Sequence, residues 1–288
     1  MTLDAFLATA WDDHGDHPQE VADRLAASMH LVQQPADVPP FAGLLAHVYG
    51  EHLGEWQRGI TLLQELRRAP GFDGSAVAEA PLARSIASLR YAGDDATALQ
   101  PLSDNDRIAV LASAAAMFAG RQDFSRAIGA YAQALRLADA GLPAGSPAIR
   151  SLAVGGNNLA AALEDKPDLD PHEVEGMLAA AQGGLTYWKR AGTWLEEERA
   201  EYRLARSLLR AGQAGAAIQS AQRCVEVCKR NAAPAFENFF GHAVLALAYR
   251  AAGNSDASAA RRDLALAELA QVPDDEKTWC ERERRELG

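Results

Sequence analysis

The sequence predicts an all-α protein built as a solenoid, in which helix–turn–helix units stack along the chain. One apolar pattern recurs, Leu-Ala followed by two variable residues and a large apolar residue, at 159–163, 204–208 and 245–249, with a weaker copy at 114–118. The glycines at 15, 54, 93, 212 and 253 separate amphipathic runs at multiples of about forty residues, a period typical of stacked helix pairs. No segment alternates polar and apolar residues for long enough to predict a strand. Because one unit cannot bury its apolar face alone, neighbouring units must stack.

Residues 1–107 are expected to form degenerate N-terminal repeats. Gly15, Gly54 and Gly93 each follow an amphipathic run and precede another, so they predict turns between helices. After Gly93 the second helix of the pair is cut short by Pro101, because proline lacks the amide that a helix interior requires.

Residues 108–272 carry the clearer repeats, and capping residues mark where their helices begin. Ser-Pro at 146–147 and Asp-Pro at 170–171 place a cap before a proline, whose missing N–H costs nothing in the first turn. Ser103 and Thr193 are each followed three residues later by an acidic residue, the spacing of a capping box. Prolines are therefore expected at helix starts or in linkers such as 38–40, with none interrupting a helical period.

Two stretches complete the organisation. Residues 108–120 are nearly all apolar and rich in alanine, which predicts a helix covered by its neighbours on all sides. The C-terminal stretch 273–288 is expected to form a charged helix that caps the last repeat, with Trp279 as its apolar anchor. The whole predicts a single domain, 1–288, of about seven helix pairs.

Composition narrows the function classes that this chain can serve. Its 288 residues are 48% hydrophobic and 23% charged, as in an ordinary folded protein, and the formal net charge is -11. That acidity argues against nucleic-acid binding, which depends on neutralising phosphates with Lys and Arg. With no signal-peptide pattern and no run of about eighteen apolar residues, we expect a cytoplasmic protein without a membrane partner. Three cysteines are too few for a disulfide framework and fit a reducing compartment.

The recurring pattern resembles the tetratricopeptide repeats (TPR), whose first helix carries Trp-x-x-Leu-Gly-x-x-Tyr and whose second carries Ala-x-x-x-Phe. Residues 242–249 match the first-helix pattern with Ala in place of Gly, and 127–135 and 217–225 match the second. Residues 4–11 and 42–49 extend the resemblance toward the N-terminus. The units are longer than the family's and lack its first-helix Trp. The resemblance implies a right-handed α-solenoid, a superhelix of stacked helix pairs whose concave groove binds a partner.

In the TPR family the first helix of each unit lines the concave groove. Carried onto this chain, the resemblance implies a peptide-binding groove formed by Asn157, Arg199, Tyr202, Arg206, Phe240 and Arg250. The spacing of three of them supports the assignment independently, because Arg199, Tyr202 and Arg206 lie at i, i+3 and i+7 and share one helix face. That face is opposite Leu204 and Leu208, which are expected to be buried.

The chemistry of this set fits an acidic peptide partner. Arginine offers a planar fork of donors to a carboxylate, Asn157 can pair with a peptide amide, and the aromatic rings give rigid apolar contact. The alternative is that these positions are ordinary solvated helix faces, with Arg199 paired to Glu196 or Glu198 on its own helix.

Other clusters invite a metal, thiol or phosphate interpretation. The turn at 11–17, Trp-Asp-Asp-His-Gly-Asp-His, concentrates oxygen and imidazole ligands, but Asp and His are common turn and cap residues, and we favour that interpretation. Cys224 and Cys228 are expected to be buried free thiols. The glycine pairs 155–156 and 183–184 are expected to allow close helix packing. Since no catalytic or phosphate-loop motif occurs, we expect neither metal nor cofactor.

These observations predict a non-enzymatic protein-interaction scaffold that holds a peptide or an extended protein segment in its groove. One alternative is a regulatory module that responds to a ligand or signalling peptide and acts on a separate partner chain. A metal-dependent enzyme that uses the Asp-His turn is the third hypothesis. Formation of a homo-oligomer through the exposed ends of a solenoid is compatible with the first two.

Overall fold

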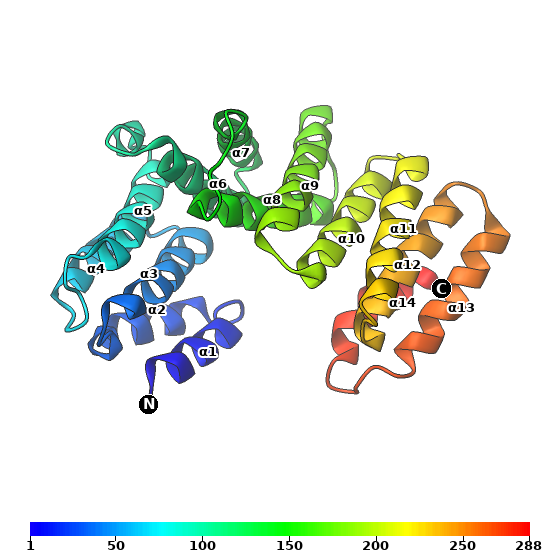
Figure 1. Ribbon diagram of the computed structural model, residues 1–288, viewed down its shortest axis with the longest axis horizontal. Helices are drawn as coiled ribbons and strands as arrows, with labels where there is room; N and C mark the ends of the chain where they lie inside the picture. The colour runs from blue at the N-terminus through cyan, green and yellow to red at the C-terminus, as the bar shows by residue number, and fades with distance from the viewer. The chain divides into compact units, whose positions relative to one another are not determined.

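The computed structural model describes residues 1–288 and contains fourteen α-helices and no strand (Figure 1). The all-α fold predicted from the sequence is therefore confirmed. Contacts divide the chain into two compact units, an N-terminal unit of residues 1–151 and a C-terminal unit of residues 152–288, and the division falls inside α8. None of the helices combines the length and the apolar character needed to span a bilayer.

The elements are short at the start of the chain and lengthen from α5 onward. Those before α8 are α1 (Leu3–Asp13), α2 (Pro18–Ala27), η1 (Met29–Leu31), η2 (Pro35–Asp37), α3 (Val38–His47), η3 (Val48–Leu53), α4 (Trp56–Glu65), η4 (Leu66–Arg68), α5 (Ala76–Ala92), η5 (Ala96–Leu99), α6 (Asp104–Gly120) and α7 (Phe124–Ala138). Those from α8 onward are α8 (Pro147–Asp165), α9 (Pro171–Ala191), α10 (Trp194–Arg210), α11 (Ala214–Arg230), α12 (Ala235–Ala251), α13 (Ser255–Leu269), η6 (Lys277–Cys280) and α14 (Glu281–Leu287).

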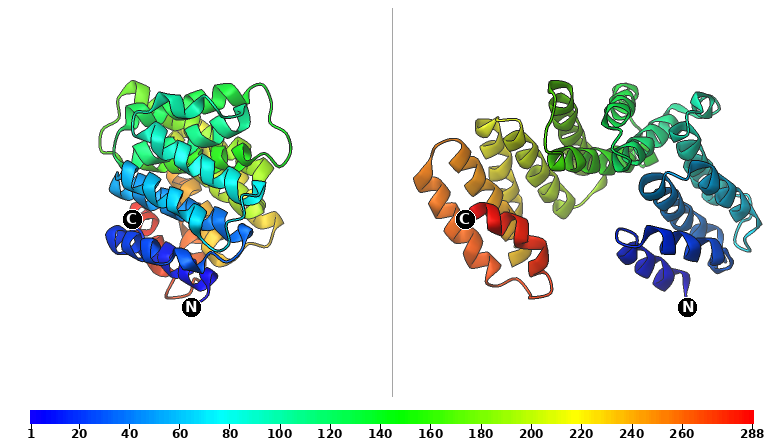
Figure 2. Two further views of the ribbon diagram at one scale, coloured as in Figure 1. Left: turned by 90° about the vertical axis from the view of Figure 1, so that its left-hand side faces the viewer. Right: turned by 180° about the vertical axis from the view of Figure 1, so that it is seen from behind.

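In the N-terminal unit the helices pack largely in chain order, with α3 and α4 against α5, α5 against α6, and α6 against α7 (Figure 2). Helix α6 is buried on nearly every side between Ile108 and Ala119, as its alanine-rich sequence predicts. Small side chains let the backbones of its neighbours approach closely, which keeps the packing dense.

The caps predicted from the sequence are present. Asp170 and Thr193 each accept a backbone N–H within the first turn of α9 and α10, and a glutamate three residues on accepts from the cap's own amide. Ser103 caps α6 by accepting from the amide of Asp106. Because the side chains satisfy amides that have no partner inside the helix, they fix where each helix begins.

The turn glycines lie between helical elements at all five positions, as predicted. Gly54, Gly212 and Gly253 adopt left-handed conformations, with φ of 68°, 72° and 76°. After α5 the left-handed residue is Asp94, with φ of 71°, and Gly93 keeps a negative φ. Aspartate is one of the few residues with a side chain that enter this region readily.

The prolines depart from expectation at two places. Residues 38–40 are not a linker, since Pro39 and Pro40 stand in the first turn of α3, where the missing N–H costs nothing. Pro81 lies inside α5, so the prediction that no proline interrupts a helix is wrong there. The seventeen-residue helix tolerates one lost hydrogen bond because Leu82 and Leu89 bury its apolar face.

A π-helix, η3, continues α3 and is held in place by the end of α6. Gly120 packs on it so closely that a Cβ at this position would lie 2.7 Å from the carbonyl oxygen of Glu51, which only glycine avoids. Arg121 donates from its guanidinium to the carbonyl oxygen of His52 at 2.8 Å. The segment ends at Gly54, a left-handed C-cap whose N–H donates to the carbonyl oxygen of Tyr49.

In the C-terminal unit α9 to α13 pack in chain order, and α10 also contacts α12. Helices α8 and α9 approach closely at Gly184, where a Cβ would lie 2.9 Å from the backbone nitrogen of Asn157. The close helix packing predicted for the glycine pair 183–184 is therefore confirmed. This approach places the backbone of Asn157 against α9.

The C-terminal segment, defined as residues 277–287 and formed by η6 and α14, differs from the predicted capping helix. The expectation that Trp279 anchors it is wrong, because this side chain is 75% exposed. Cys280 and Leu287 are buried instead, in a core that includes Phe239 and Leu247 of α12. The 3₁₀ geometry of η6 turns Cys280 inward and leaves its neighbour in solvent, and α14 lies against α12 (Figure 2).

Candidate functional site

The six residues expected to form the groove lie on three helices of the C-terminal unit. Asn157 is on α8, Arg199, Tyr202 and Arg206 are on α10, and Phe240 and Arg250 are on α12. The buried side of α10 carries Leu204 and Leu208, which are 5% and 9% exposed, so the three α10 residues share the opposite face as their spacing predicts.

Two cavities divide these residues between them. The larger, of about 1090 Å³, is lined by Asn157, Arg199, Tyr202 and Phe240. The smaller, of about 320 Å³, is lined by Arg206 and Arg250. Residues of the C-terminal segment line both cavities. The larger cavity is lined by Trp279, Arg282 and Glu283, and the smaller by Arg282 and Glu286.

An aromatic wall runs along one side of the larger cavity. The ring of Phe240 meets those of Tyr202 and Phe236 edge to face, with centroids 5.5 Å and 5.0 Å away. Trp279 adds an exposed indole at the same cavity. Edge-to-face contacts hold the rings rigidly, so the wall is preformed rather than assembled on binding.

The C-terminal segment occupies part of the face assigned to the groove. Tyr202 donates from its hydroxyl to Oε1 of Glu283 at 2.5 Å. Arg206 donates twice to the Glu286 carboxylate, the Nη2–Oε1 bond being 2.9 Å long, and Arg250 donates to the Glu286 carbonyl oxygen at 2.8 Å. Three of the six candidate residues are therefore engaged by the chain's own carboxyl end.

The remaining arginine of the set also has a partner within the chain. Arg199 binds the Glu237 carboxylate of α12, with an Nη2–Oε1 distance of 2.5 Å, while its side chain stays 56% exposed. The alternative interpretation foresaw an intrachain pair but placed it on Glu196 or Glu198 of the same helix. The structure pairs neighbouring first helices instead, which the sequence spacing does not reveal.

Buried carboxyl groups lie beneath this face. Burial and the nearby Glu237 carboxylate raise the pKa of Glu198 to about 8, so this carboxyl group holds a proton at neutral pH. Cys224 donates from its thiol to Glu198 at 3.0 Å. Burial also raises the pKa of Glu164, although Arg203 and Ser207 both donate to it at 2.6 Å.

Burial and neighbouring charges also shift the pKa values of Tyr202 and of Glu286, which binds the groove face. Burial, together with the Glu283 carboxylate, raises the pKa of Tyr202 well above its usual value. The hydroxyl therefore stays protonated and remains a donor throughout the neutral range. In contrast, the hydrogen bonds from Arg206 lower the pKa of Glu286, so the pair is ionised.

Sequence reasoning missed the residues supplied by the C-terminal segment and by Phe236. Glu283 and Glu286 lie about eighty residues from their partners on α10, so no local pattern connects them. Their i, i+3 spacing on a short charged helix was the available signal, because it places both carboxylates on one face.

The thiol and turn candidates have different outcomes. Cys224 and Cys228 are fully buried and free, as expected. In the Asp-His turn, Asp13 pairs with Arg24 at 2.6 Å and His17 with Glu20 at 3.8 Å.

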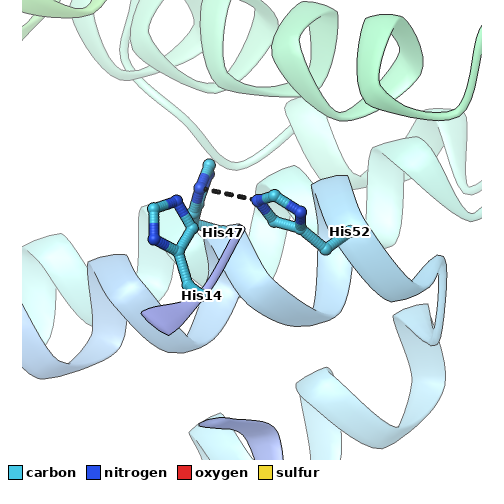
Figure 3. Close-up of side chains that lie close together, drawn as sticks. All are labelled: His14, His47 and His52. Carbon is cyan, nitrogen blue, oxygen red and sulfur yellow. Dashed lines mark hydrogen bonds between the residues drawn. The ribbon is translucent and has the colours of Figure 1, made fainter. Parts of the chain in front are cut away.

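His14 is the member of that turn that joins a cluster, with His47 and His52 (Figure 3). Burial, and next the nearby His47, lower the pKa of His52, so its imidazole is neutral around pH 7. The partner histidines come from α3 and η3, and the sequence alone did not predict that these elements lie next to the turn.

Comparison with known proteins supports the fold. No family model matches the chain, and no curated protein matches its sequence. A solved structure from Podosopora anserina, described as "putative kinesin light chain nearly identical TPR-like repeats", superimposes with a TM-score of 0.52 at 14% identity, covering 84% of this chain and 99% of that one. A variant of it gives 0.50 at 15% identity, covering 88% and 97%. The resemblance to TPR-like helical repeats is therefore confirmed at the level of fold.

Proposed function

We propose that the C-terminal unit binds a segment of a partner protein in the larger cavity, and that the chain is a non-enzymatic, cytoplasmic interaction scaffold. The observation that carries the proposal is the convergence of Asn157, Arg199, Tyr202 and Phe240 on one cavity that also has an exposed Trp279. Tryptophan, tyrosine and arginine are the residues that most often dominate binding energy at protein interfaces. The TPR-like fold is a second support, since helical repeats present extended binding surfaces.

The number of elements that line the cavity favours a peptide over a small molecule. Its volume of about 1090 Å³ is close to the upper end of the ~300–1000 Å³ of ordinary small-molecule pockets. Side chains from α8, α10, α12 and the C-terminal segment line it, so a bound segment of several residues would contact four elements. A small ligand would leave most of this lining in water.

The lining also suggests the chemistry of the partner. Phe236, Phe240 and Trp279 would take an apolar side chain, and the half-exposed guanidinium of Arg199 would take a carboxylate next to it. The chain itself provides an example, because Glu283 binds Tyr202 on the same face. We therefore propose a partner segment in which an apolar residue is followed by acidic ones.

The experiment uses two lining residues that carry little of the fold. Asn157 makes only a long side-chain bond, 3.5 Å to Asn158, and Trp279 is largely exposed. A partner recovered from native cell extract by the wild-type protein should be lost by the double variant Asn157→Ala and Trp279→Ala. Leu264→Ala, a substitution of an exposed residue of α13, is the matched control and should retain the partner. Equal recovery by all three proteins would remove this cavity from the site.

The regulatory alternative also has an observation in its favour. The C-terminal segment lies on Tyr202, Arg206 and Arg250, so a partner that needs this face must displace it. In that case binding would free residues 277–287, and their amide hydrogen exchange would accelerate when the partner is added. A scaffold that uses only the larger cavity would leave this exchange unchanged or slow it.

A further inference from the structure

Three histidines that are distant in sequence meet in the N-terminal unit, at a place that the proposed function does not use. His14 follows the last residue of α1, His47 ends α3, and His52 lies in the π-helix η3. One ring nitrogen from each lies within 4.8 Å of the others, and Nε2 of His47 is 3.1 Å from Nε2 of His52 (Figure 3). All three side chains are partly exposed, so an ion can reach them from solvent.

The π-helix is what brings His47 and His52 together. In an α-helix residues five apart point about 140° away from each other, because each residue turns the chain by about 100°. The wider η3 turn puts His52 beside His47, with ring centroids 4.8 Å apart. Short π-helical segments of this kind are frequent at functional sites. Here Gly120 and Arg121 hold the turn from outside.

Two of the rings are oriented by acceptors on their outer side. His14 Nδ1 lies 2.5 Å from the carbonyl oxygen of Trp11, and His47 Nδ1 lies 2.9 Å from Oε2 of Glu51. A carbonyl or carboxylate oxygen only accepts, so both Nδ1 atoms carry the proton and both Nε2 atoms keep a lone pair. Metal-binding histidines show this arrangement, in which an outer acceptor fixes the tautomer and makes the inner nitrogen a better ligand.

The spacing of the nitrogens suits a small ion. Nε2 of His52 is hydrogen-bonded to Nε2 of His47 at 3.1 Å, and two nitrogens bound tetrahedrally to zinc at ~2.0–2.1 Å are separated by about 3.3 Å, so an ion can replace this hydrogen bond with little movement once His52 carries its proton on Nδ1. Because no two of the three nitrogens are more than 4.8 Å apart, the most distant one must move by at most about 1.5 Å to reach the same separation, within the range of a side-chain rotation. Imidazole nitrogens prefer zinc and other late transition metals over magnesium or calcium.

We propose that His14, His47 and His52 bind one divalent transition-metal ion of the zinc type, with Glu51 positioning His47 and the fourth coordination position left to water. Three imidazoles satisfy the usual number of protein ligands of a zinc site that keeps one open position. The ion would join α1 to α3 and η3, which are otherwise linked by few contacts. The inference is independent of the peptide cavity, because every ligand lies in the N-terminal unit.

The direct test measures zinc binding by the full chain prepared without a polyhistidine tag and stripped with a chelator. Zinc alone is titrated against a chromophoric competitor. The wild-type protein and His17→Ala, which removes an exposed histidine outside the cluster, should each bind one ion with equal affinity. His52→Ala should weaken binding by more than 100-fold, and Glu51→Gln by about 10- to 100-fold, the usual effect of removing an outer acceptor.

Two further measurements separate binding from folding. Zinc should raise the thermal midpoint of the wild-type protein and of His17→Ala but not that of His52→Ala, whose midpoint without zinc reports whether the variant folds. Trp11, whose ring centroid lies 5.0 Å and 5.1 Å from those of His14 and His47, should be quenched when copper occupies the site, and Trp11→Phe should remove that quenching. Equal zinc affinity of wild type and His52→Ala, or loss of binding in His17→Ala, would overturn the proposal.

Discussion

Arg206 and Glu286, eighty residues apart in the chain, form a two-bonded ion pair that ties α10 to α14. The Arg206 side chain is 10% exposed and the Glu286 side chain 35% exposed, so the pair is partly shielded from water. Arg250 of α12 adds a bond to the carbonyl oxygen of the same glutamate. The C-terminal segment is thereby held across the helix face that the sequence assigned to a partner.

Replacing Arg206 should loosen the C-terminal segment. Arg206→Ala leaves the Glu286 carboxylate without its main partner, so we expect a loss of about 2 kcal/mol in the unfolding free energy of the C-terminal unit. Amide hydrogen exchange at 281–287 should accelerate at the same time. Arg285→Ala, at an exposed position of the same helix, is the control and should leave exchange unchanged. Exchange that stays slow in Arg206→Ala would show that Cys280 and Leu287 hold the segment alone.

The Tyr202 hydroxyl should matter because it serves a buried acceptor. Glu283 is 3% exposed, and Tyr202→Phe removes its donor without changing the packing of the ring. Leaving a buried acceptor unsatisfied costs about 1–3 kcal/mol, which urea unfolding would detect. The control is Tyr249→Phe, which removes a bond to the exposed Gln222 and should cost much less. Equal stability of the two variants would contradict the buried role.

Glu198 should make stability depend on pH. The fold raises its pKa from about 4.5 to about 8, so the protonated form is favoured in the folded state. The stabilising contribution is complete below the unfolded pKa and is lost as pH rises through about 8, so the unfolding free energy should fall by a few kcal/mol between pH 5 and pH 8. Glu198→Gln mimics the protonated form and should flatten this fall, leaving the smaller share contributed by Glu164. Denaturant unfolding at several pH values provides the measurement, and an unchanged slope in Glu198→Gln would refute it.

Gly120 should be intolerant of any side chain. A methyl group there would lie 2.4 Å from Cγ and 2.7 Å from the carbonyl oxygen of Glu51, so Gly120→Ala should destabilise the N-terminal unit by about 2 kcal/mol. Gly129 of α7 has no atom within 4 Å of such a methyl group, and Gly129→Ala should stabilise its helix by about 0.5–1 kcal/mol. Opposite shifts in thermal midpoint are therefore expected, and parallel shifts would contradict the close approach.

The sequence predicted those features of the fold and of the candidate site that depend on residues close together in the chain. The capping box at Thr193, the N-cap at Asp170 and the burial of 108–120 each follow from residues within a few turns of one another. The face shared by Arg199, Tyr202 and Arg206 belongs to the same class, because helical geometry fixes it. These predictions are confirmed by the structure.

What could not be predicted depends on contacts between distant segments. The pairing of Arg199 with Glu237 is set by how α10 meets α12, and the position of Glu286 by how the chain folds back after α13. A local pattern favoured Trp279 as an anchor, but the 3₁₀ turn buries Cys280 in its place. The histidine cluster depends on a π-helix, which no local sequence pattern predicts.

The central proposal is that the cavity beside Trp279 receives a partner segment, and site-specific photo-cross-linking tests it most directly. A photoreactive amino acid is placed at position 279 in one protein and at position 264, exposed on α13, in another. Mass spectrometry then identifies any cross-linked segment in native extract, and a synthetic copy is titrated against wild type and Asn157→Ala. We predict a cross-link from 279 alone, to an apolar and acidic segment whose affinity falls at least tenfold in Asn157→Ala. Cross-links of equal yield from both positions, or an affinity that Asn157→Ala does not change, would contradict it.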